Sequence, residues 1–473
     1  MSNKSLSALG QREKFGSRLG FVLISAGCAI GLGNVWRFPA IVGQYGGAAF
    51  ILLYLLFLVI FGLPIMTMEF AVGRASQKSI ASSFTALETK GSKWHLFSWV
   101  GLVGNYLLMM FYTVVTAWMF IYFFKSVAGD FAGHIPEQVS GQYYQVRGNY
   151  LLQTGATILV IALGILICSM GLKKGVEKVN KIMMIALLVI IVLLAVYVCT
   201  LPGAEKGLDF YLIPRFENLI YDAKGNFILG EVMFAAMGQA FFTLSIGMGS
   251  MAVFGSYIKK DRSLFGESVI IASLDTGVAF IAGLIVIPAA FAYPVSTGNI
   301  IGGPGLIFET LPNVFNNMPF GNILGPFFFL FMIFAAMSTV TAVFENIISF
   351  GMDKWGWSRK KACFITLISL VFLSQFCILG YTVLSSFQPL GAGTFIMDLE
   401  DFLVSNNILP LGSLVYVLFC VLDKGAWGYD KFLLEANTGK GLKMPKKLKF
   451  YFKYVLPLLL IVFWVFGIIM YFA

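Results

Sequence analysis

The segment 26–39 reads AGCAIGLGNVWRFP, and it decides the fold of this chain. It lies in an apolar stretch long enough to cross a membrane, yet it contains three glycines, an asparagine and an arginine. Such residues interrupt a helix, and interrupted backbone at membrane depth is tolerated only where it is buried in protein, lines a cavity or binds something. Free carbonyl groups suit a small hard cation, whereas the N-terminal end of a half-helix suits a carboxylate. The segment therefore predicts a binding site within a membrane.

The composition of the whole chain is that of an integral membrane protein. Of the 473 residues, 58% are hydrophobic and only 12% are charged, which is far more apolar than a soluble core requires. A membrane span needs about 20 mostly apolar residues. With glycine tolerated, the runs of this length number eleven: 18–43, 47–70, 97–124, 150–171, 178–200, 232–258, 264–292, 321–352, 361–384, 395–422 and 452–472.

The basic residues predict the orientation of these spans in the cell membrane. Most of the 33 Lys and Arg fall in segments that lie on one side: 1–18, 73–95, 171–181, 259–262, 353–361 and 423–454. Because cytoplasmic loops carry an excess of Lys and Arg, we expect a cytoplasmic N-terminus and, with eleven spans, an outer C-terminus. The positive-inside distribution then accounts for the net charge of +10. Because the basic residues are spread over every inner loop and form no single patch, they argue against nucleic-acid binding.

The sequence offers no residue set for enzymatic chemistry. The six cysteines lie in or at the ends of apolar spans without a CxxC spacing, and the only histidines, His95 and His134, are far apart. Neither pattern fits a metal cluster or a nucleophile–histidine pair. We therefore expect a protein that is not an enzyme and that acts within the membrane.

Polar residues at membrane depth are costly and usually functional. Five spans place theirs in one layer: the break in the first span, GQAFFTLSIGMGS at 238–250 in the sixth, Tyr112, Asp275, and the pair Ser338 and Thr339. Glycines alone also serve close helix packing, and Tyr112 alone fits a packed aromatic residue. An unpaired carboxylate at this depth costs several kcal/mol or is protonated, so Asp275 needs a cation or another partner.

The first and sixth spans are five apart, opposite in orientation, and both interrupted by glycine. Paired interrupted helices in corresponding positions indicate an inverted-repeat transporter. A channel is the alternative that also concentrates polar groups, but it needs a continuous polar lining, whereas this polar layer is narrow and flanked by apolar residues.

Five segments resemble the neurotransmitter:sodium symporters, the family of sodium-coupled amino-acid transporters with the LeuT fold. They are GCAIGLGNVWRFP (27–39), GQYGGAAF (43–50), LPIMTMEFAVGR (63–74), GQAFFTLSIGMG (238–249) and FAAMSTVTAVFENI (334–347). The resemblance implies one all-α membrane transporter domain (1–473), with a first repeat at 12–200, an inverted second repeat at 232–422, and discontinuous first and sixth helices. The last span, 452–472, lies outside the repeat, and many relatives have twelve spans where this chain has eleven.

The resemblance also implies two sodium sites made of oxygen ligands, which suit a hard monovalent cation. The first site consists of the substrate carboxylate, the Ala29 carbonyl and the side chains of Asn34, Thr243 and Asp275. The second site consists of the carbonyls of Gly27, Ile30 and Ala335 and the hydroxyls of Ser338 and Thr339.

The implied substrate is an amino acid. Monoamine carriers of the family have an aspartate at the position of Gly31, so this chain lacks the carboxylate that replaces a missing substrate carboxylate. Met248 stands where some relatives have phenylalanine, and its flexible thioether adapts to varied apolar shapes, which favours hydrophobic or aromatic L-amino acids. We expect Tyr112 to donate to the substrate carboxylate and Ser245 to lie near the amine. The implied pocket is Cys28, Ala29, Gly31, Gly33, Leu108, Tyr112, Phe242, Thr243, Ser245, Met248 and Ser338.

Chloride is not expected as a co-substrate. Chloride-dependent relatives have a serine at the position of Ala279 and an asparagine-type sodium ligand at the position of Asp275. This chain has no hydroxyl at the first position and a fixed negative charge at the second.

Two charged pairs are implied as gates in an alternating-access mechanism. Arg37 and Asp401 form the outer gate, and Arg12 and Asp353, with Tyr257, form the inner gate. We expect Glu69 to be structural, and the role of Glu345 stays open. A proton-coupled carrier of the same fold and an amino-acid receptor without transport remain alternatives, and the sequence leaves the exact substrate, the sodium stoichiometry and dimerisation open.

Overall fold

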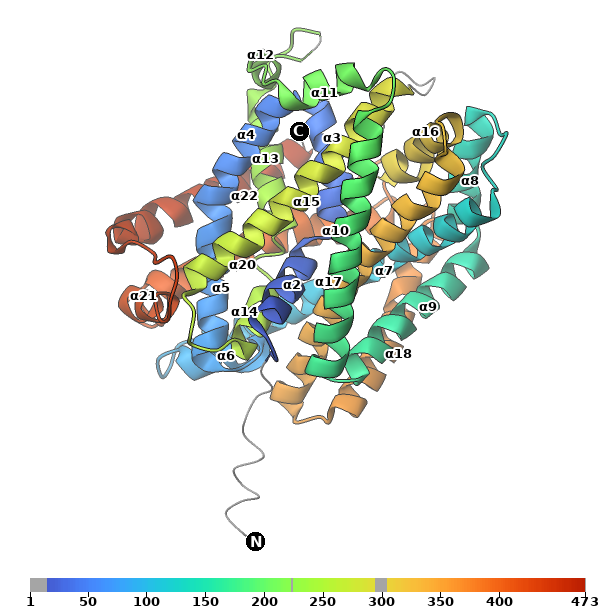
Figure 1. The fold of residues 1–473 in the computed structure, drawn as a ribbon. Helices are drawn as coiled ribbons and strands as arrows, with labels where there is room; N and C mark the ends of the chain where they lie inside the picture. Colours follow the sequence, from blue (N-terminus) through green and yellow to red (C-terminus); the bar gives the residue numbers. More distant parts are fainter. Residues whose placement is uncertain (1–14, 223, 294–303, 473) are drawn as a thin grey trace.

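The fold of the chain is all-helical throughout the described residues of the computed structural model, which are 15–222, 224–293 and 304–472 (Figure 1). Within these residues, extended pairing is limited to the isolated bridges Tyr221–Phe227 and Arg262–Lys440. The long apolar spans contain, alone or joined end to end, the helices α4 (Ala48–Phe57), α5 (Leu63–Ser76), α7 (Phe97–Ala128), α9 (Tyr150–Ser169), α10 (Lys178–Cys199), α15 (Leu264–Ala292), α17 (Gly321–Trp355), α18 (Arg359–Gly380), α20 (Leu409–Val421) and α22 (Leu456–Phe472).

The other helices complete the spans or lie at the two ends of the molecule. They are α2 (Arg18–Ala29), α3 (Phe38–Gln44), α6 (Ile80–Leu87), α8 (Pro136–Gly148), α11 (Ala204–Leu212), α12 (Glu217–Ile220), α13 (Leu229–Thr243), α14 (Ser250–Tyr257), α16 (Leu311–Asn317), α19 (Ile396–Asp401) and α21 (Tyr429–Ala436). Wide π-helical turns join several of them: η1 (Gly33–Arg37), η2 (Leu58–Gly62), η4 (Leu172–Glu177), η5 (Leu306–Thr310), η6 (Phe402–Ile408) and η8 (Tyr451–Val455).

Nine helices among the described residues are long and apolar enough to cross a membrane, and a tenth span is formed if the bent pair Arg18–Ala29 and Gly33–Gln44 is counted as one. The axes of this pair differ by 56°. These ten agree in position with ten of the predicted spans. The predicted sixth span, 232–258, consists of α13 and α14 separated by non-helical residues, so the count of eleven stays a prediction.

The two interrupted helices break at similar height. In Figure 1, α2 and α14 lie toward the end of the molecule where the described chain begins, and α3 and α13 lie toward the other end. Helix α2 stops because Ile30 is extended, with φ −70° and ψ 97°. Between α13 and α14, Gly247 has φ +98°, and a Cβ there would lie 2.2 Å from the Leu409 carbonyl oxygen. Only glycine allows both this backbone conformation and this close approach.

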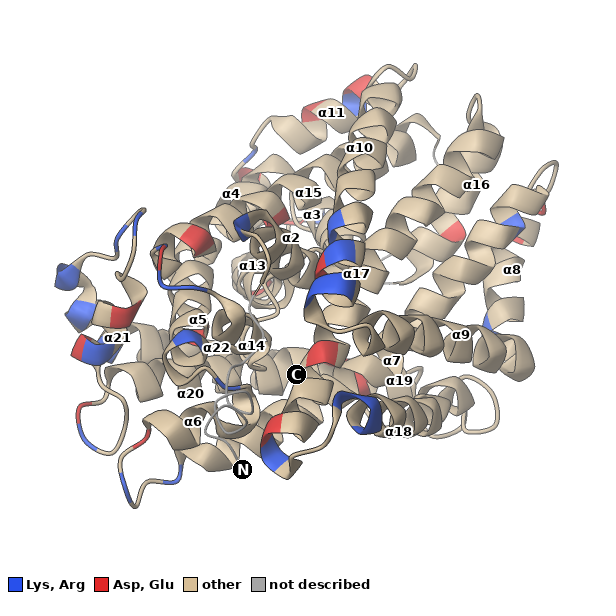
Figure 2. Cartoon of the chain, turned by 60° about the horizontal axis from the view of Figure 1, so that its bottom comes forward, with Lys and Arg blue, Asp and Glu red and all other residues tan. Residues whose placement is uncertain are grey.

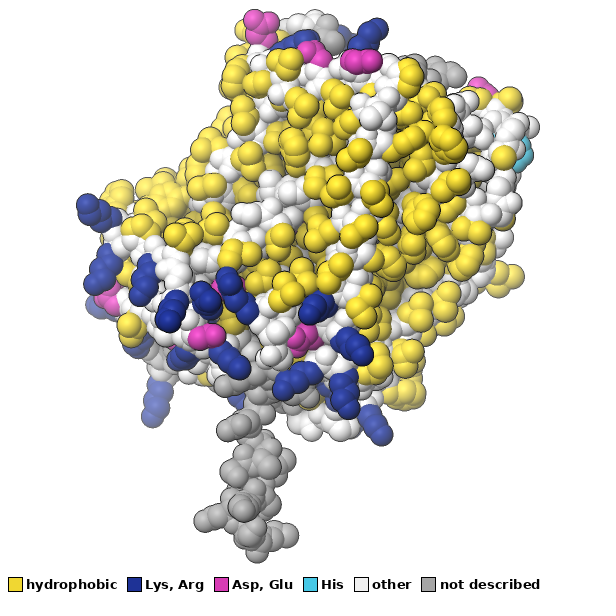
Figure 3. Space-filling model, viewed as in Figure 1, with side chains coloured by type: hydrophobic (Ala, Val, Ile, Leu, Met, Phe, Trp, Pro, Cys, Tyr) yellow, Lys and Arg dark blue, Asp and Glu magenta, His cyan; other side chains and the backbone are white. Residues whose placement is uncertain are grey.

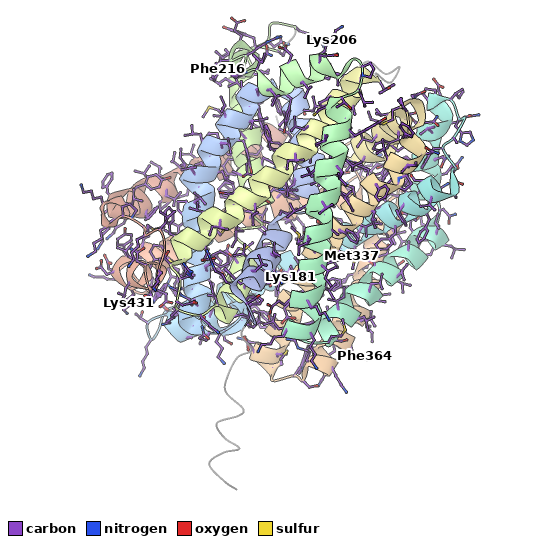
Figure 4. The ribbon with its side chains drawn as sticks, in the orientation of Figure 1. Lys181, Lys206, Phe216, Met337, Phe364 and Lys431 are labelled. Atoms are coloured by element: carbon purple, nitrogen blue, oxygen red, sulfur yellow. The ribbon has the colours of Figure 1, made fainter. Side chains whose placement is uncertain are left out.

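The charged residues divide the surface into a broad apolar band and two polar ends. In Figure 3, Lys and Arg gather at the end where the described chain begins, which we call the basic face, and apolar side chains cover most of the height above it. Figure 2 shows the basic residues of this face on helix ends and turns, including those around α21 and the start of α18. Figure 4 places Lys206 and Phe216 at the opposite face, far from Lys431. This distribution fits a protein surrounded by lipid.

Candidate functional site

A buried carboxylate lies where α15 passes the break in the first span. Asp275 is fully buried, and its Oδ1 accepts a hydrogen bond of 2.7 Å from Asn34 Nδ2. The same nitrogen donates to the Asp275 carbonyl at 3.0 Å, and Thr243 Oγ1 donates to Asp275 Oδ2 at 2.8 Å. No Lys, Arg or His of the described chain forms an ion pair with Asp275. The structure thus gathers three of the four protein ligands predicted for the first sodium site.

A second group of oxygens lies between the end of α2 and α17. Ser338 Oγ is 2.8 Å from the carbonyl oxygens of both Gly27 and Ala335. Thr339 Oγ1 lies 3.3 Å from the Gly27 oxygen and 3.5 Å from that of Ile30. These are the five residues predicted for the second sodium site. No group of three His, Cys, Asp or Glu in the described ranges is arranged to hold a metal ion. The second group offers carbonyl and hydroxyl oxygens, which suit an alkali cation.

A small cavity of about 20 Å³ lies beside these two groups. Most of the predicted pocket residues line it, and four further residues complete the wall: Cys28, Ala29, Gly31, Gly33, Leu108, Tyr112, Phe242, Ser245 and Met248, with Leu32, Thr339, Val404 and Leu409. The remaining two predicted pocket residues, Thr243 and Ser338, belong to the oxygen groups instead. Ala29, predicted for the first sodium site, lines this cavity.

The polar groups of the cavity are held by backbone contacts. The Leu32 N–H donates to the Tyr112 hydroxyl oxygen at 3.1 Å, which leaves the Tyr112 proton available for another acceptor. Ser245 has the left-handed φ of +50°, and its Oγ donates to the Cys28 carbonyl at 3.3 Å. Strain of this kind in a non-glycine residue is often found at functional sites. A Cβ at Gly31 would lie 2.5 Å from the Tyr112 hydroxyl oxygen, so a side chain there would fill the cavity.

Val404 and Leu409 line the pocket but were not predicted from the sequence. Both are apolar residues in an apolar span, and such residues give no signal by themselves. They reach the cavity from η6 and the start of α20, where the helix widens ahead of Pro410. The neighbouring pair Asn406 and Asn407 is polar, but polar residues do not by themselves indicate a π-helical turn.

A larger cavity of about 320 Å³ lies above the small one, toward the face opposite the basic face. Arg37 and Asp401, the predicted outer gate, both line it, but no ion pair joins them within the described chain. The Arg37 guanidinium instead lies over the Phe242 ring, 4.6 Å from its centre. Asp401 Oδ1 accepts from Ser405 Oγ at 2.6 Å. Leu32, Tyr112 and Phe242 line both cavities and therefore form the partition between them.

Near the basic face, side chains of α14, α17 and α18 and the start of α6 contact one another. Of the predicted inner gate, Arg12 lies outside the described residues. Tyr257 donates from its hydroxyl to Glu345 Oε1 at 3.0 Å, and Asp353 Oδ2 accepts from the Ser79 N–H at 2.7 Å. Glu345 also makes two hydrogen bonds to Arg359, of 2.8 and 2.9 Å, which identifies it as part of an ion pair.

One further buried carboxylate supports the interrupted region. Glu69 in α5 is fully buried and accepts a hydrogen bond from the Gly247 N–H, within the non-helical segment between α13 and α14. This contact satisfies a backbone group that the interruption frees, and it agrees with the structural role expected for Glu69.

Comparison with known proteins gives concordant matches over nearly the whole chain. The family model described as "Sodium:neurotransmitter symporter family" matches residues 12–140 and 145–473. The chain is 33% identical to an uncharacterized sodium-dependent transporter of Bacillus subtilis, with 86% of this chain and 87% of the relative covered. It is 32% identical to one of Methanocaldococcus jannaschii, with 95% and 89% covered. The crystal structure of MhsT in complex with L-phenylalanine is similar with a TM-score of 0.85 and 35% identity, covering 97% of this chain and 100% of that one.

Proposed function

The chain belongs to the sodium:neurotransmitter symporter family, and from this membership we propose that it couples the uptake of an L-amino acid to the sodium gradient. The family is one of sodium-dependent secondary transporters and not of enzymes. The observation that carries the proposal is the position of Asp275. This buried carboxylate, which has no cationic side-chain partner among the described residues, lies beside a cavity that also adjoins the oxygen group of Ser338 and Thr339.

In the proposed first sodium site, Na⁺ is a substrate held by Ala29, Asn34, Thr243 and Asp275 together with the carboxylate of the amino acid. The Asn34 amide nitrogen donates to Asp275 and the amide oxygen accepts from the Gly31 N–H at 3.1 Å, so the side chain would have to rotate to offer that oxygen to an ion beside Asp275. Because the substrate carboxylate is itself a ligand, sodium and amino acid each raise the affinity of the other. The second site uses the oxygens of Gly27, Ile30, Ala335, Ser338 and Thr339.

We propose a hydrophobic or aromatic L-amino acid as the substrate. Leu108, Phe242, Met248, Val404 and Leu409 supply an apolar wall, and the similar MhsT structure contains L-phenylalanine. The absence of a side chain at residue 31 supports a substrate that brings its own carboxylate. The Tyr112 proton, free of the Leu32 contact, is available to that carboxylate.

Transport without chloride is a further part of the proposal. Ala279 is fully buried and carries no hydroxyl, and the charge of Asp275 already occupies the neighbouring turn of α15. Uptake is therefore expected to persist when gluconate replaces chloride at constant sodium. A fall in uptake on this replacement would contradict the assignment.

Alternating access would move the interrupted first and sixth helices relative to the others around a fixed site. We assign the repeats to 12–200 and 232–422, with 452–472 outside them. The basic face is assigned to the cytoplasm and the C-terminus to the outside of the cell membrane. Arg37 and Asp401 would close the outer cavity, and the contacts of Tyr257 and Asp353 would close the inner side.

The test is uptake of radiolabelled amino acid into proteoliposomes with an inward sodium gradient. The twenty amino acids are first ranked by thermal stabilisation of the purified protein with and without sodium. Asp275→Ala should abolish sodium-dependent binding, whereas Asp430→Ala, at a side chain that is 86% exposed, should leave it unchanged. Unchanged sodium dependence in Asp275→Ala refutes the assignment. Counterflow with choline in place of sodium at two pH values identifies a proton-coupled carrier, and binding without uptake identifies a receptor.

A further inference from the structure

A single arginine on the face opposite the basic face is surrounded by aromatic rings. Arg147 lies in the last turn of α8, and its guanidinium carbon is 4.2 Å from the ring centre of Tyr381 and 4.9 Å from that of Phe395. The rings of Tyr143 and Tyr144, on the same helix, lie at 5.0 and 5.9 Å. A guanidinium within about 6 Å of a ring centre is attracted by the ring quadrupole, and the attraction grows when water is excluded.

The backbone of Arg147 is also fixed. Its carbonyl accepts a hydrogen bond of 2.7 Å from Gln153 Nε2, and Gln153 Oε1 accepts from Trp118 Nε1 at 2.9 Å. Trp118 is fully buried in α7 and contacts the Tyr143 and Tyr381 rings at 5.8 and 5.6 Å. The arginine therefore lies on a rigid aromatic cluster and not on a mobile loop.

This cluster joins segments that are far apart in sequence. Tyr381 ends α18 and Phe395 precedes α19, and their rings are 4.8 Å apart. Tyr143 stacks on Phe308 of η5 with an interplanar angle of 11°. Burial raises the pKa of the adjacent Glu309 above its usual range, while the positive charge of Arg147 acts to lower it. The arginine thus connects α8 with both η5 and the start of α19.

Two hydrogen bonds join the cluster to the wall of the larger cavity. The Tyr381 hydroxyl donates to Met397 Sδ at 3.3 Å, and the Phe395 N–H donates to Asp398 Oδ2 at 2.7 Å. Met397 and Asp398 both line the 320 Å³ cavity, together with Asp401. Arg147 itself is absent from the lining, so any influence it has on the cavity is transmitted through these residues.

We propose that Arg147 is a positioning residue that holds the α19 wall of the larger cavity in place and so sets how readily this cavity opens. Removing the charge leaves the rings in contact but eliminates the attraction that draws α8, Tyr381 and Phe395 together. The wall then moves away from Arg37 and Phe242 more often. The direction of opening, toward the outside of the cell, rests on the proposed function, whereas the link between Arg147 and the cavity does not.

The test measures access to the cavity directly. A cysteine is placed at Ala40, which lines the cavity, and the purified full chain is labelled with a charged, membrane-impermeant methanethiosulfonate. The chain without Ala40→Cys gives the background labelling of its six free cysteines. Arg147→Ala should raise the labelling rate roughly tenfold, and Arg147→Lys, which keeps a cation over the rings, should stay within about threefold. Arg215→Ala is the matched control, because Arg215 is an exposed arginine paired with Asp209 at 2.5 Å.

Two results would overturn the inference: equal labelling rates in Arg147→Ala and Arg215→Ala, or the same rate in the lysine and alanine variants. If Arg147→Ala does not fold, Phe395→Leu decides, since it keeps the arginine and removes one ring. A faster rate in Phe395→Leu supports the inference, and an unchanged rate refutes it. Labelling requires neither sodium nor substrate, so an absence of sodium-coupled uptake in the unmodified chain would refute the proposed function and leave the labelling result standing.

Discussion

Replacing Thr339 with valine tests the second oxygen group with the smallest change in shape. The substitution keeps the branched side chain and removes Oγ1, which lies 3.3 Å from the Gly27 carbonyl oxygen and 3.5 Å from those of Cys28 and Ile30. A hydrogen-bonding contact to a charged group contributes about 1.5–3 kcal/mol, so losing one oxygen ligand to Na⁺ should weaken sodium binding by roughly 10- to 150-fold. We expect the half-saturating sodium concentration to rise by that factor.

The assay is thermal stabilisation of purified protein as a function of sodium concentration at saturating amino acid. Thr341→Val is the matched control, because Thr341 is fully buried on the same helix and loses hydrogen bonds to Asn180 and to the Ser338 carbonyl. Both variants should melt at a lower temperature without sodium, but only Thr339→Val should change the sodium titration. An unchanged titration in Thr339→Val, or an equal shift in both variants, would show that Thr339 is not a sodium ligand.

Four further outcomes are expected. Gly247→Ala should lower the melting temperature sharply, because its Cβ would meet a backbone oxygen of the tenth predicted span at 2.2 Å, whereas Gly277→Ala, with nothing within 4 Å, should melt normally. Gly31→Ala should abolish amino-acid binding in a thermal-shift titration, since its Cβ would lie 2.5 Å from the Tyr112 hydroxyl oxygen. Val404→Ala should favour larger amino acids in competition assays by enlarging the 20 Å³ cavity. When sodium is present at 100 times its dissociation constant, replacing it with choline should lower the free energy of unfolding by about 2.7 kcal/mol. Chemical denaturation measures this difference, and no change would argue against a sodium site.

The helical architecture could be predicted from the sequence because the length of an apolar run is set by the thickness of the bilayer. Ten predicted spans match long helices or the bent pair within a few residues. The interruptions were predictable too, since glycine and asparagine are conspicuous in an otherwise apolar run. The wide turns η1, η2 and η6 were not predicted, because a π-helical turn depends on how neighbouring helices pack and not on local propensity alone.

The candidate site was predictable where it is polar and not where it is apolar. Asn34, Asp275 and Ser338 stand out because each is costly at membrane depth without a partner, and the structure gives each one a buried hydrogen bond. Val404 and Leu409 have no such signature, and their orientation toward the cavity depends on the geometry of η6.

The contact that Arg37 of the predicted outer gate makes could not be predicted from the sequence. The sequence placed Arg37 and Asp401 near one another, and both line the larger cavity. It contained no information on which of two partners Arg37 contacts, because Phe242 and Asp401 line the same cavity as Arg37. The choice between a ring and a carboxylate depends on the conformation of the whole protein.

The partition between the two cavities has a kinetic consequence. It is one side chain thick, since Leu32, Tyr112 and Phe242 face the small cavity on one side and the large cavity on the other. Leu32 and Tyr112 are buried, with 4% and 2% of their surface exposed, so passage between the cavities requires packed side chains to move. Under the proposed function, these three residues would control how fast a substrate enters from the outer cavity.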